Sequence, residues 1–262
     1  MKRAKLLGLQ VLVMVVFLLL WHVVTAYPIM GDVKTIQFFF STPAAVIART
    51  WNQLTGAEIY WHIGITLTET VLAFVIGSAA GIFFGFTFAR RELLAAVFDP
   101  YIKAANALPR VVLAPIFALW FGLGIWSKVA LGFTLVFFIV FFNVYQGVRE
   151  VSPTVLANAR MLGMNERQLF KHVYWPSALT WMFSSLHTSV GFALIGAVVG
   201  EYLGSSAGLG YKIQEAESVF DVTGVFSGML ILTIFVIAID AVVTMVEKRL
   251  LVWRPAQSTT TT

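Results

Sequence analysis

The sequence predicts an all-α polytopic membrane protein with six transmembrane helices. Its 262 residues are 59% hydrophobic and 12% charged, whereas soluble domains are about 45–50% apolar and about 25% charged. A bilayer core about 30 Å thick is crossed by about 20 apolar residues in a helix, and blocks of that length recur along the chain. We expect spans at about 6–27, 64–89, 104–123, 127–147, 177–203 and 225–246.

The first span follows a basic start, MKRAK, and could be mistaken for a signal peptide. No convincing small-residue cleavage motif follows it, and the apolar block is about long enough to cross a bilayer. We therefore expect it to be retained as a helix. At the other end of the chain, the final QSTTTT is low in complexity and is expected to be disordered.

The connection at 28–62 is more polar than the blocks on either side of it. Thr42 and Pro43 can cap a short helix at about 43–54, and its apolar side chains favour a position at the membrane interface. The next uncertain stretch is 93–110, where Pro100 and Pro109 interrupt the pattern. The start of the third span is therefore poorly defined.

Glycine recurs at four-residue spacing in the second and fifth spans. Small residues on one helix face let a neighbouring helix approach closely, so we expect these glycines to serve packing. They are Gly77, Gly81 and Gly85 in one span, and Gly196, Gly200 and Gly204 in the other.

The distribution of Lys and Arg predicts the orientation. With six spans, every Lys and Arg except Lys34, Arg49, Lys128 and Lys212 falls on one side. Basic loops stay in the cytoplasm. Both termini and the loop at about 149–176 are thus expected to be cytoplasmic, and the loop at 28–62 periplasmic. The net charge of +5 reflects these flanks rather than nucleic-acid binding.

The long polar segment at 155–176, called the knob below, predicts two short helices around a bend. Ser152 and Pro153 suit the start of the first helix, and Gly163 suits its end because glycine adopts a left-handed conformation freely. Asn165 with Gln168 resembles a capping box, and Pro176 opens the next span. A rigid knob of this kind suits docking to a partner, although an ordinary helical hairpin has the same pattern.

The knob resembles the cytoplasmic coupling loop of ABC importer permeases. Gly163, nine residues, and then Val173-Tyr-Trp-Pro176 match that signature, while Ala157-Asn158-Ala159 stands where the family has Glu-Ala-Ala, so the glutamate is missing. Charge could come instead from Arg160, Glu166, Arg167 and Lys171. The resemblance implies that an ATPase contacts Ala157, Asn158, Ala159, Arg160, Leu162, Gly163, Met164, Asn165, Val173 and Pro176.

Further stretches, among them Ser41–Val46, Leu108–Gly124 and Gly200–Tyr211, resemble the branch of these permeases that imports nitrate, taurine and alkanesulfonates. The resemblance implies a type I (MetI-like) permease fold in a bacterial inner membrane, moving a small polar or anionic solute. It implies a second permease copy, two ATPase subunits that bind ATP and Mg, and a periplasmic or lipid-anchored solute-binding protein. A gradient-driven secondary transporter is the alternative.

The residues argue against catalysis by this chain alone. Cysteine is absent, the four histidines are scattered, and no Gly-rich loop ends in Gly-Lys-Ser/Thr; the segment 122–128 comes nearest. We therefore expect no cofactor or metal in the chain. Nor do His, Asp and Glu cluster at helical spacing as a membrane-embedded enzyme would require.

Ionisable groups within spans are candidates for a solute pathway or gate. His187, Gly191 and Glu201 fall within about 40° of one another on a helix, and Ser184 lies beside them. Glu201 is either such a group or a surface carboxylate, whereas Glu69 is expected to be interfacial and exposed to water. Asp240 is expected to face protein within the sixth span. The full set of candidates is His187, Ser184, Gly191, Glu201, Glu69 and Asn143.

Overall fold

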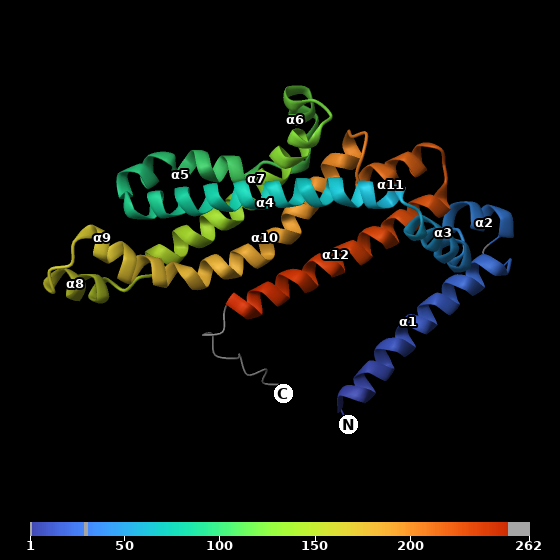
Figure 1. Cartoon of the computed structure of the whole chain (residues 1–262), viewed down its shortest axis with the longest axis horizontal. Helices are drawn as coiled ribbons and strands as arrows, with labels where there is room; N and C mark the ends of the chain where they lie inside the picture. The colour runs from blue at the N-terminus through green and yellow to red at the C-terminus, as the bar shows by residue number, and fades with distance from the viewer. Residues whose placement is uncertain (1, 29–30, 251–262) are drawn as a thin grey trace.

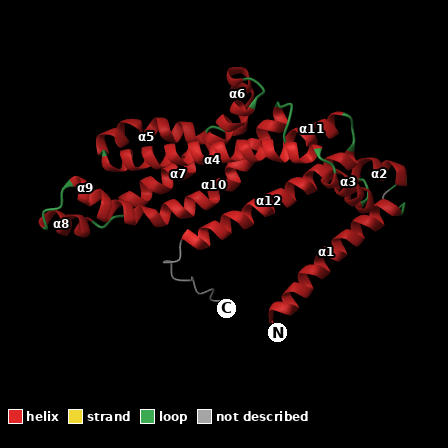
Figure 2. Cartoon of the chain, viewed as in Figure 1, coloured by secondary structure: helices red, strands yellow, loops and turns green. Residues whose placement is uncertain are grey.

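The structure is a computed structural model that describes residues 2–28 and 31–250. Within these ranges the chain forms helices and turns and no strand, which confirms the all-α prediction (Figure 2). The molecule is elongated, with α8 (Pro153–Met161) and α9 (Glu166–Leu169) at one end (Figure 1). At the opposite end lie α2 (Val33–Phe40), α3 (Pro43–Thr55) and α11 (Leu209–Ser218).

Three long helices, α4 (Glu58–Arg90), α7 (Ile125–Arg149) and α10 (Trp175–Leu203), form the core of the bundle. The glycines of α4 let α7 approach closely. A Cβ added at Gly77, Gly81 or Gly85 would lie 2.8 Å from the Cβ of a valine on α7. The expected packing role of this stripe is confirmed, because any larger side chain would force the two helices apart.

Gly196 makes an even closer contact, since a Cβ there would lie 2.4 Å from the Cα of Gly132 on α7. The three core helices are therefore held at distances that only small residues allow. Their register fixes which polar side chains of α4, α7 and α10 meet inside the bundle.

The expected single span at about 104–123 is wrong. The chain instead forms α5 (Glu92–Ala107), a 3₁₀ turn at Arg110–Leu113 and α6 (Ala114–Phe121), with a bend of 87° between the two parts. Pro109 disfavours a helical conformation at Leu108, which is extended with φ −64° and ψ 132°. Pro100, by contrast, lies inside α5 without ending it.

Two outer helices flank the core and bury little of their own surface (Figure 1). They are α1 (Lys2–Ala26) and α12 (Val222–Leu250), whose most apolar windows are 0% and 6% buried. Five described helices are long and apolar enough to cross a membrane, and the bent pair makes a sixth passage if it is counted as one span. The exposed apolar faces of α1 and α12 suit contact with lipid or with another subunit.

The connection after α1 holds the helix expected at about 43–54 and, before it, a second helix that was not expected, α2. The second, α3, begins as expected, because the Thr42 hydroxyl accepts a hydrogen bond from the Ala45 N–H at 3.2 Å. The next helix begins at Glu58, earlier than the expected 64. The C-terminal QSTTTT segment lies outside the described residues.

Candidate functional site: a two-helix knob and a buried charge cluster

The first helix of the knob ends in a hydrogen-bonded glycine turn. Gly163 has φ +77°, and its N–H donates to the carbonyl of Arg160 at 2.9 Å. The N–H of Met164 donates to the carbonyl of Ala159 at 3.1 Å. These two bonds form a Schellman motif, which satisfies the last carbonyls of a helix. The predicted bend at Gly163 is therefore present, although the Ser152 side chain makes no capping bond.

The second helix begins with the predicted capping box. The Asn165 side chain accepts from the Gln168 N–H at 2.9 Å, and the Gln168 side chain accepts from the Asn165 N–H at 2.9 Å. This helix is not separate from the next span, however. It continues through a π-helical turn at Phe170–Tyr174 into α10. Pro176 explains the wide turn, because proline has no N–H and its ring crowds the preceding turn.

Arg90, the last residue of α4, connects the knob to the core. Its guanidinium pairs with the Glu166 carboxylate at 2.5 Å and lies 5.8 Å from the ring centre of Phe170 and 5.7 Å from that of Tyr174. Phe86 of α4 stacks on Trp175 at 5.5 Å. Sequence reasoning had not linked Arg90 to the knob, since its partners lie far along the chain. The knob is thus joined to both α4 and α10.

The tip of the knob exposes apolar side chains. Met161 is 84% and Leu162 79% exposed, and exposed apolar groups at such a tip suit a protein contact. Ala159 is buried, so it is not available to a partner in this structure. Of the other predicted contact residues, Met164 and Val173 are half-buried, and the exposed ones are Ala157, Asn158, Arg160, Gly163, Asn165 and Pro176.

Three ionisable side chains meet in the core, one from each long helix. Glu69 of α4, Lys128 of α7 and Glu201 of α10 are each only 1% exposed. The expectation that Glu69 is interfacial and exposed to water is therefore wrong, as is the alternative of a surface carboxylate at Glu201. The two carboxylates lie beside each other, and both are within electrostatic reach of Lys128. A buried cation near paired carboxylates offsets part of their desolvation.

Glu201 closes a turn against the bundle. Its carboxylate accepts hydrogen bonds from the Thr66 hydroxyl at 2.6 Å and from the Gly210 N–H at 2.7 Å. Thr66 in turn accepts from the Leu209 N–H at 2.9 Å. Gly208 has φ +112°, and a Cβ there would lie 2.1 Å from the carboxyl carbon of Glu201. The turn between α10 and α11 therefore has no room for a side chain at Gly208.

Lys128 secures a second turn at the same part of the bundle. Its ammonium donates to the carbonyls of Leu123 and, at 3.1 Å, of Gly124. Both carbonyls belong to the connection between α6 and α7. Sequence reasoning did not select Lys128, although a lone lysine at the start of an apolar span was a visible signal.

The expected common face of α10 does not form. Gly191 is exposed with no atom within 4 Å of an added Cβ, whereas Glu201 is buried. His187 lies between these extremes, with its Nε2 3.9 Å from a carboxylate oxygen of Asp240. Asp240 faces α10 through this contact, as expected, although 70% of its side chain is exposed in the single chain.

Two other pathway candidates differ in their surroundings. Ser184 is exposed on α10 close to Thr188 and Gly191, which are exposed as well. Asn143 is half-buried on α7, and its side-chain amide donates to the carbonyl of Ile139 in the same helix at 2.8 Å. Ser184 therefore lies on an open face, while Asn143 already has a partner in its own helix.

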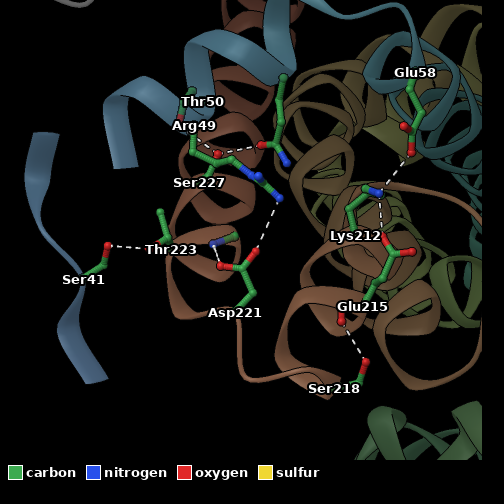
Figure 3. A network of polar contacts seen from close by, with 12 residues as sticks. Ser41, Arg49, Thr50, Glu58, Lys212, Glu215, Ser218, Asp221, Thr223 and Ser227 are labelled. Carbon is green, nitrogen blue, oxygen red and sulfur yellow. Dashed lines mark hydrogen bonds and ion pairs between the residues drawn. The ribbon is translucent and has the colours of Figure 1, made fainter. Parts of the chain in front are cut away.

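A polar network ties the helices at the end opposite the knob (Figure 3). Arg49 of α3 pairs with Asp221 at 3.4 Å, and Lys212 of α11 bonds Glu58 at 3.1 Å and also Glu215. Burial lowers the pKa of the Lys212 ammonium, but its hydrogen bonds to the two glutamates raise the pKa by more. The pKa of Lys212 is therefore raised. Hydroxyl pairs extend the network, namely Ser41 with Thr223 and Thr50 with Ser227.

Comparison with known proteins settles the class of this chain. A family model described as "Binding-protein-dependent transport system inner membrane component" matches residues 73–252, which include the knob and two members of the buried cluster, Lys128 and Glu201. The chain belongs to this family. It is an ABC importer permease of the sulfonate/taurine branch with a MetI-like fold, as the sequence predicted.

Relatives and solved structures agree with this assignment. The chain is 33% identical to the formylaminopyrimidine transport permease protein ThiX of Halalkalibacterium halodurans, over 84% of this chain and 88% of the relative. It is 31% identical to the putative aliphatic sulfonates transport permease protein SsuC of Bacillus subtilis, over 81% and 77%. The MetNI methionine ABC transporter, in an inward-facing conformation, gives a TM-score of 0.55 at 15% identity, over 78% of this chain and 94% of that chain.

Proposed function

We propose that this permease subunit forms the membrane path of an ATP-driven importer in the bacterial inner membrane. The observation that carries the proposal is the knob. It is closed by a Schellman turn and a capping box, exposes Met161 and Leu162, and is joined to two core helices. In this proposal each of two ATPase subunits, which bind the ATP and Mg, grips one knob of a pair of permease copies.

The knob would act as a lever on α4 and α10. Closing of the ATPase pair would move α8 and α9 together, because their connection is fixed by backbone hydrogen bonds. The pairing of Arg90 with Glu166 would transmit the movement to α4. The unbroken helix from α9 through the π turn would transmit it to α10. The closed ATPase pair would shift the permease between two conformations only if it bound the knobs of one conformation more tightly than those of the other.

The opposite end of the bundle would face the periplasm and a solute-binding protein, with both termini in the cytoplasm. The polar network there joins α3 to the start of α12 and α11 to the start of α4. Exposed Val219 and Phe220, 71% and 75% accessible, lie between α11 and α12 and offer an apolar contact. A docked binding protein would thus act on α12 and also on α10, through the turn at Gly208 that packs against Glu201.

The open face of α10 with Ser184, His187 and Gly191 would line the solute path between the two copies. The path would carry a small polar or anionic solute, in line with relatives named for aliphatic sulfonates and taurine. Glu69 and Glu201 are buried, so they would stabilise the turns next to the buried charge cluster rather than contact the solute. Asn143 would contribute only if its bond to Ile139 opened.

Gentle extraction from native membranes, with mass identification of what accompanies the tagged chain, tests the proposal. We expect an ABC ATPase at about one copy per permease. Leu162→Asp should release the ATPase while the permease remains folded, and Val219→Asp, at an exposed valine at the end opposite the knob, should not. A permease recovered alone after crosslinking would contradict coupling. Uptake that resists vanadate but collapses with an uncoupler would then favour gradient-driven transport.

A further inference from the structure

A cavity of about 540 Å³ lies where α4 meets the π turn that leads into α10. One wall is apolar and runs along α4 from Ala79 through Ile82 and Phe83. The aromatic rings of Phe170 and Trp175 form another side. No part of the polar network or of the buried charge cluster belongs to its lining, so the cavity is a separate feature of the molecule.

The cavity is basic at one end only. Arg90 and Arg91 both line it, at the point where α4 ends. Arg90 already pairs with Glu166, which is not a lining residue. Arg91 is exposed, and no carboxylate among the side chains that the structure describes forms an ion pair with it. The mouth of the cavity therefore carries one uncompensated positive charge beside a second arginine.

The length of the apolar wall matches one leaflet of a bilayer. Ala79 and Arg90 are eleven residues apart on α4, which at about 1.5 Å per residue is about 16 Å. Half of a hydrocarbon core about 30 Å thick is about 15 Å. A molecule with its charge at Arg91 and its tail along Phe83 and Ala79 would span the leaflet from the headgroup level to the midplane.

We propose that this cavity binds one anionic phospholipid, with the phosphate at Arg91 and Arg90 and an acyl chain along the apolar wall of α4. A free inorganic anion would use the arginines but not the apolar wall. A bound lipid would contact Arg90, Phe170 and Trp175, the residues that join α4 to the knob. It would therefore brace the connection between the coupling knob and the core.

Native mass spectrometry of the purified permease complex in nanodiscs tests the proposal, with phosphatidylglycerol and phosphatidylethanolamine of matched chains as probes. We expect wild type to retain phosphatidylglycerol preferentially. Arg91→Gln should lower that retention about fivefold, because one basic side chain near a lipid surface contributes about 1 kcal/mol. Ala79→Phe, at an exposed position, adds a ring to the apolar wall without changing charge and should also displace the lipid.

Arg149→Gln is the matched control, since Arg149 is an exposed arginine at the knob end of α7 and does not line the cavity. It should leave retention unchanged. Equal losses in Arg91→Gln and Arg149→Gln would show attraction by general charge and overturn the site. Equal retention of the two lipids by wild type would overturn it too. Displacement by inorganic phosphate with no effect of Ala79→Phe would identify a small-anion site instead of a lipid site.

Discussion

Replacing Gly208 by alanine tests whether the turn between α10 and α11 depends on close packing over Glu201. Gly208 has φ +112° and ψ 171°, a region that is essentially restricted to glycine and costs another residue about 1–3 kcal/mol. The added methyl group would also lie 2.1 Å from the carboxyl carbon of Glu201, and overpacking of this kind costs about 1–3 kcal/mol more. We therefore expect a loss of about 2–6 kcal/mol.

Gly163→Ala provides the matched control, because Gly163 also has a positive φ, +77°, but an added Cβ there meets no atom within 4 Å. Only the backbone penalty applies, about 1–2 kcal/mol. Thermal unfolding of the purified permease in detergent should therefore place Gly208→Ala well below Gly163→Ala, and Gly163→Ala slightly below wild type.

Equal thermal unfolding midpoints for the two variants would refute the reasoning, since they would show that the close contact with Glu201 contributes nothing to the loss of stability. The double variant Gly208→Ala/Glu201→Ala offers a second check. Removing the carboxylate opens space for the methyl group, so part of the loss caused by Gly208→Ala should be absent in the Glu201→Ala background. Additive losses would mean that Glu201 is not the group the methyl displaces.

Three other predictions concern charged groups. Arg90→Glu should impair uptake and lower stability by about 1–3 kcal/mol, because the ion pair to the 67% exposed Glu166 contributes about 0–1 kcal/mol and the contacts with the Phe170 and Tyr174 rings about 0.5–1 kcal/mol each. The double variant Arg90→Glu/Glu166→Arg should recover uptake, and failure of this rescue would argue against transmission through the pair. Lys128→Met removes the ammonium that donates to the carbonyls of Leu123 and Gly124 and should cost about 1.5–3 kcal/mol, the contribution of a hydrogen bond from a charged group. Lys103→Met, at an exposed lysine on α5, should cost little, and similar thermal midpoints for the two variants would contradict this role of Lys128. The raised pKa of Lys212 gives a stabilisation that is complete below the ordinary lysine pKa of about 10.4 and lost as pH rises through the higher folded value. Thermal midpoints of Lys212→Met should accordingly fall less between neutral and strongly alkaline pH than those of wild type, and parallel curves would contradict this.

Features set by neighbouring residues could be predicted well from the sequence. The turn at Gly163 and the capping box of Asn165 and Gln168 both appear, because their hydrogen bonds join groups no more than five residues apart. The close packing of the α4 glycines and the helix at Lys2–Ala26 follow from spacing and length in the same way. Pro109 signalled a break, but the direction of the following chain did not follow from it.

Contacts between distant segments could not be predicted. Glu69 was placed at the water interface because it lies near the end of an apolar block, yet it is buried beside Glu201 and near Lys128, which come from other helices. The knob's attachment through Arg90 was missed for the same reason, since Arg90 and Glu166 lie far apart in sequence. Helical angles correctly relate residues of α10 to one another but do not say which neighbour covers each of them.

The sequence by itself determined that this chain is a helical membrane protein, about where its long helices lie apart from the bent third span, and that it resembles the importer permeases. Those features depend on composition and on hydrogen bonds within one or two helical turns. Only the tertiary structure decided which charges are buried, where the third span bends and how the knob reaches α4. Such features depend on the register of packed helices, which close glycine contacts between α4, α7 and α10 fix in space.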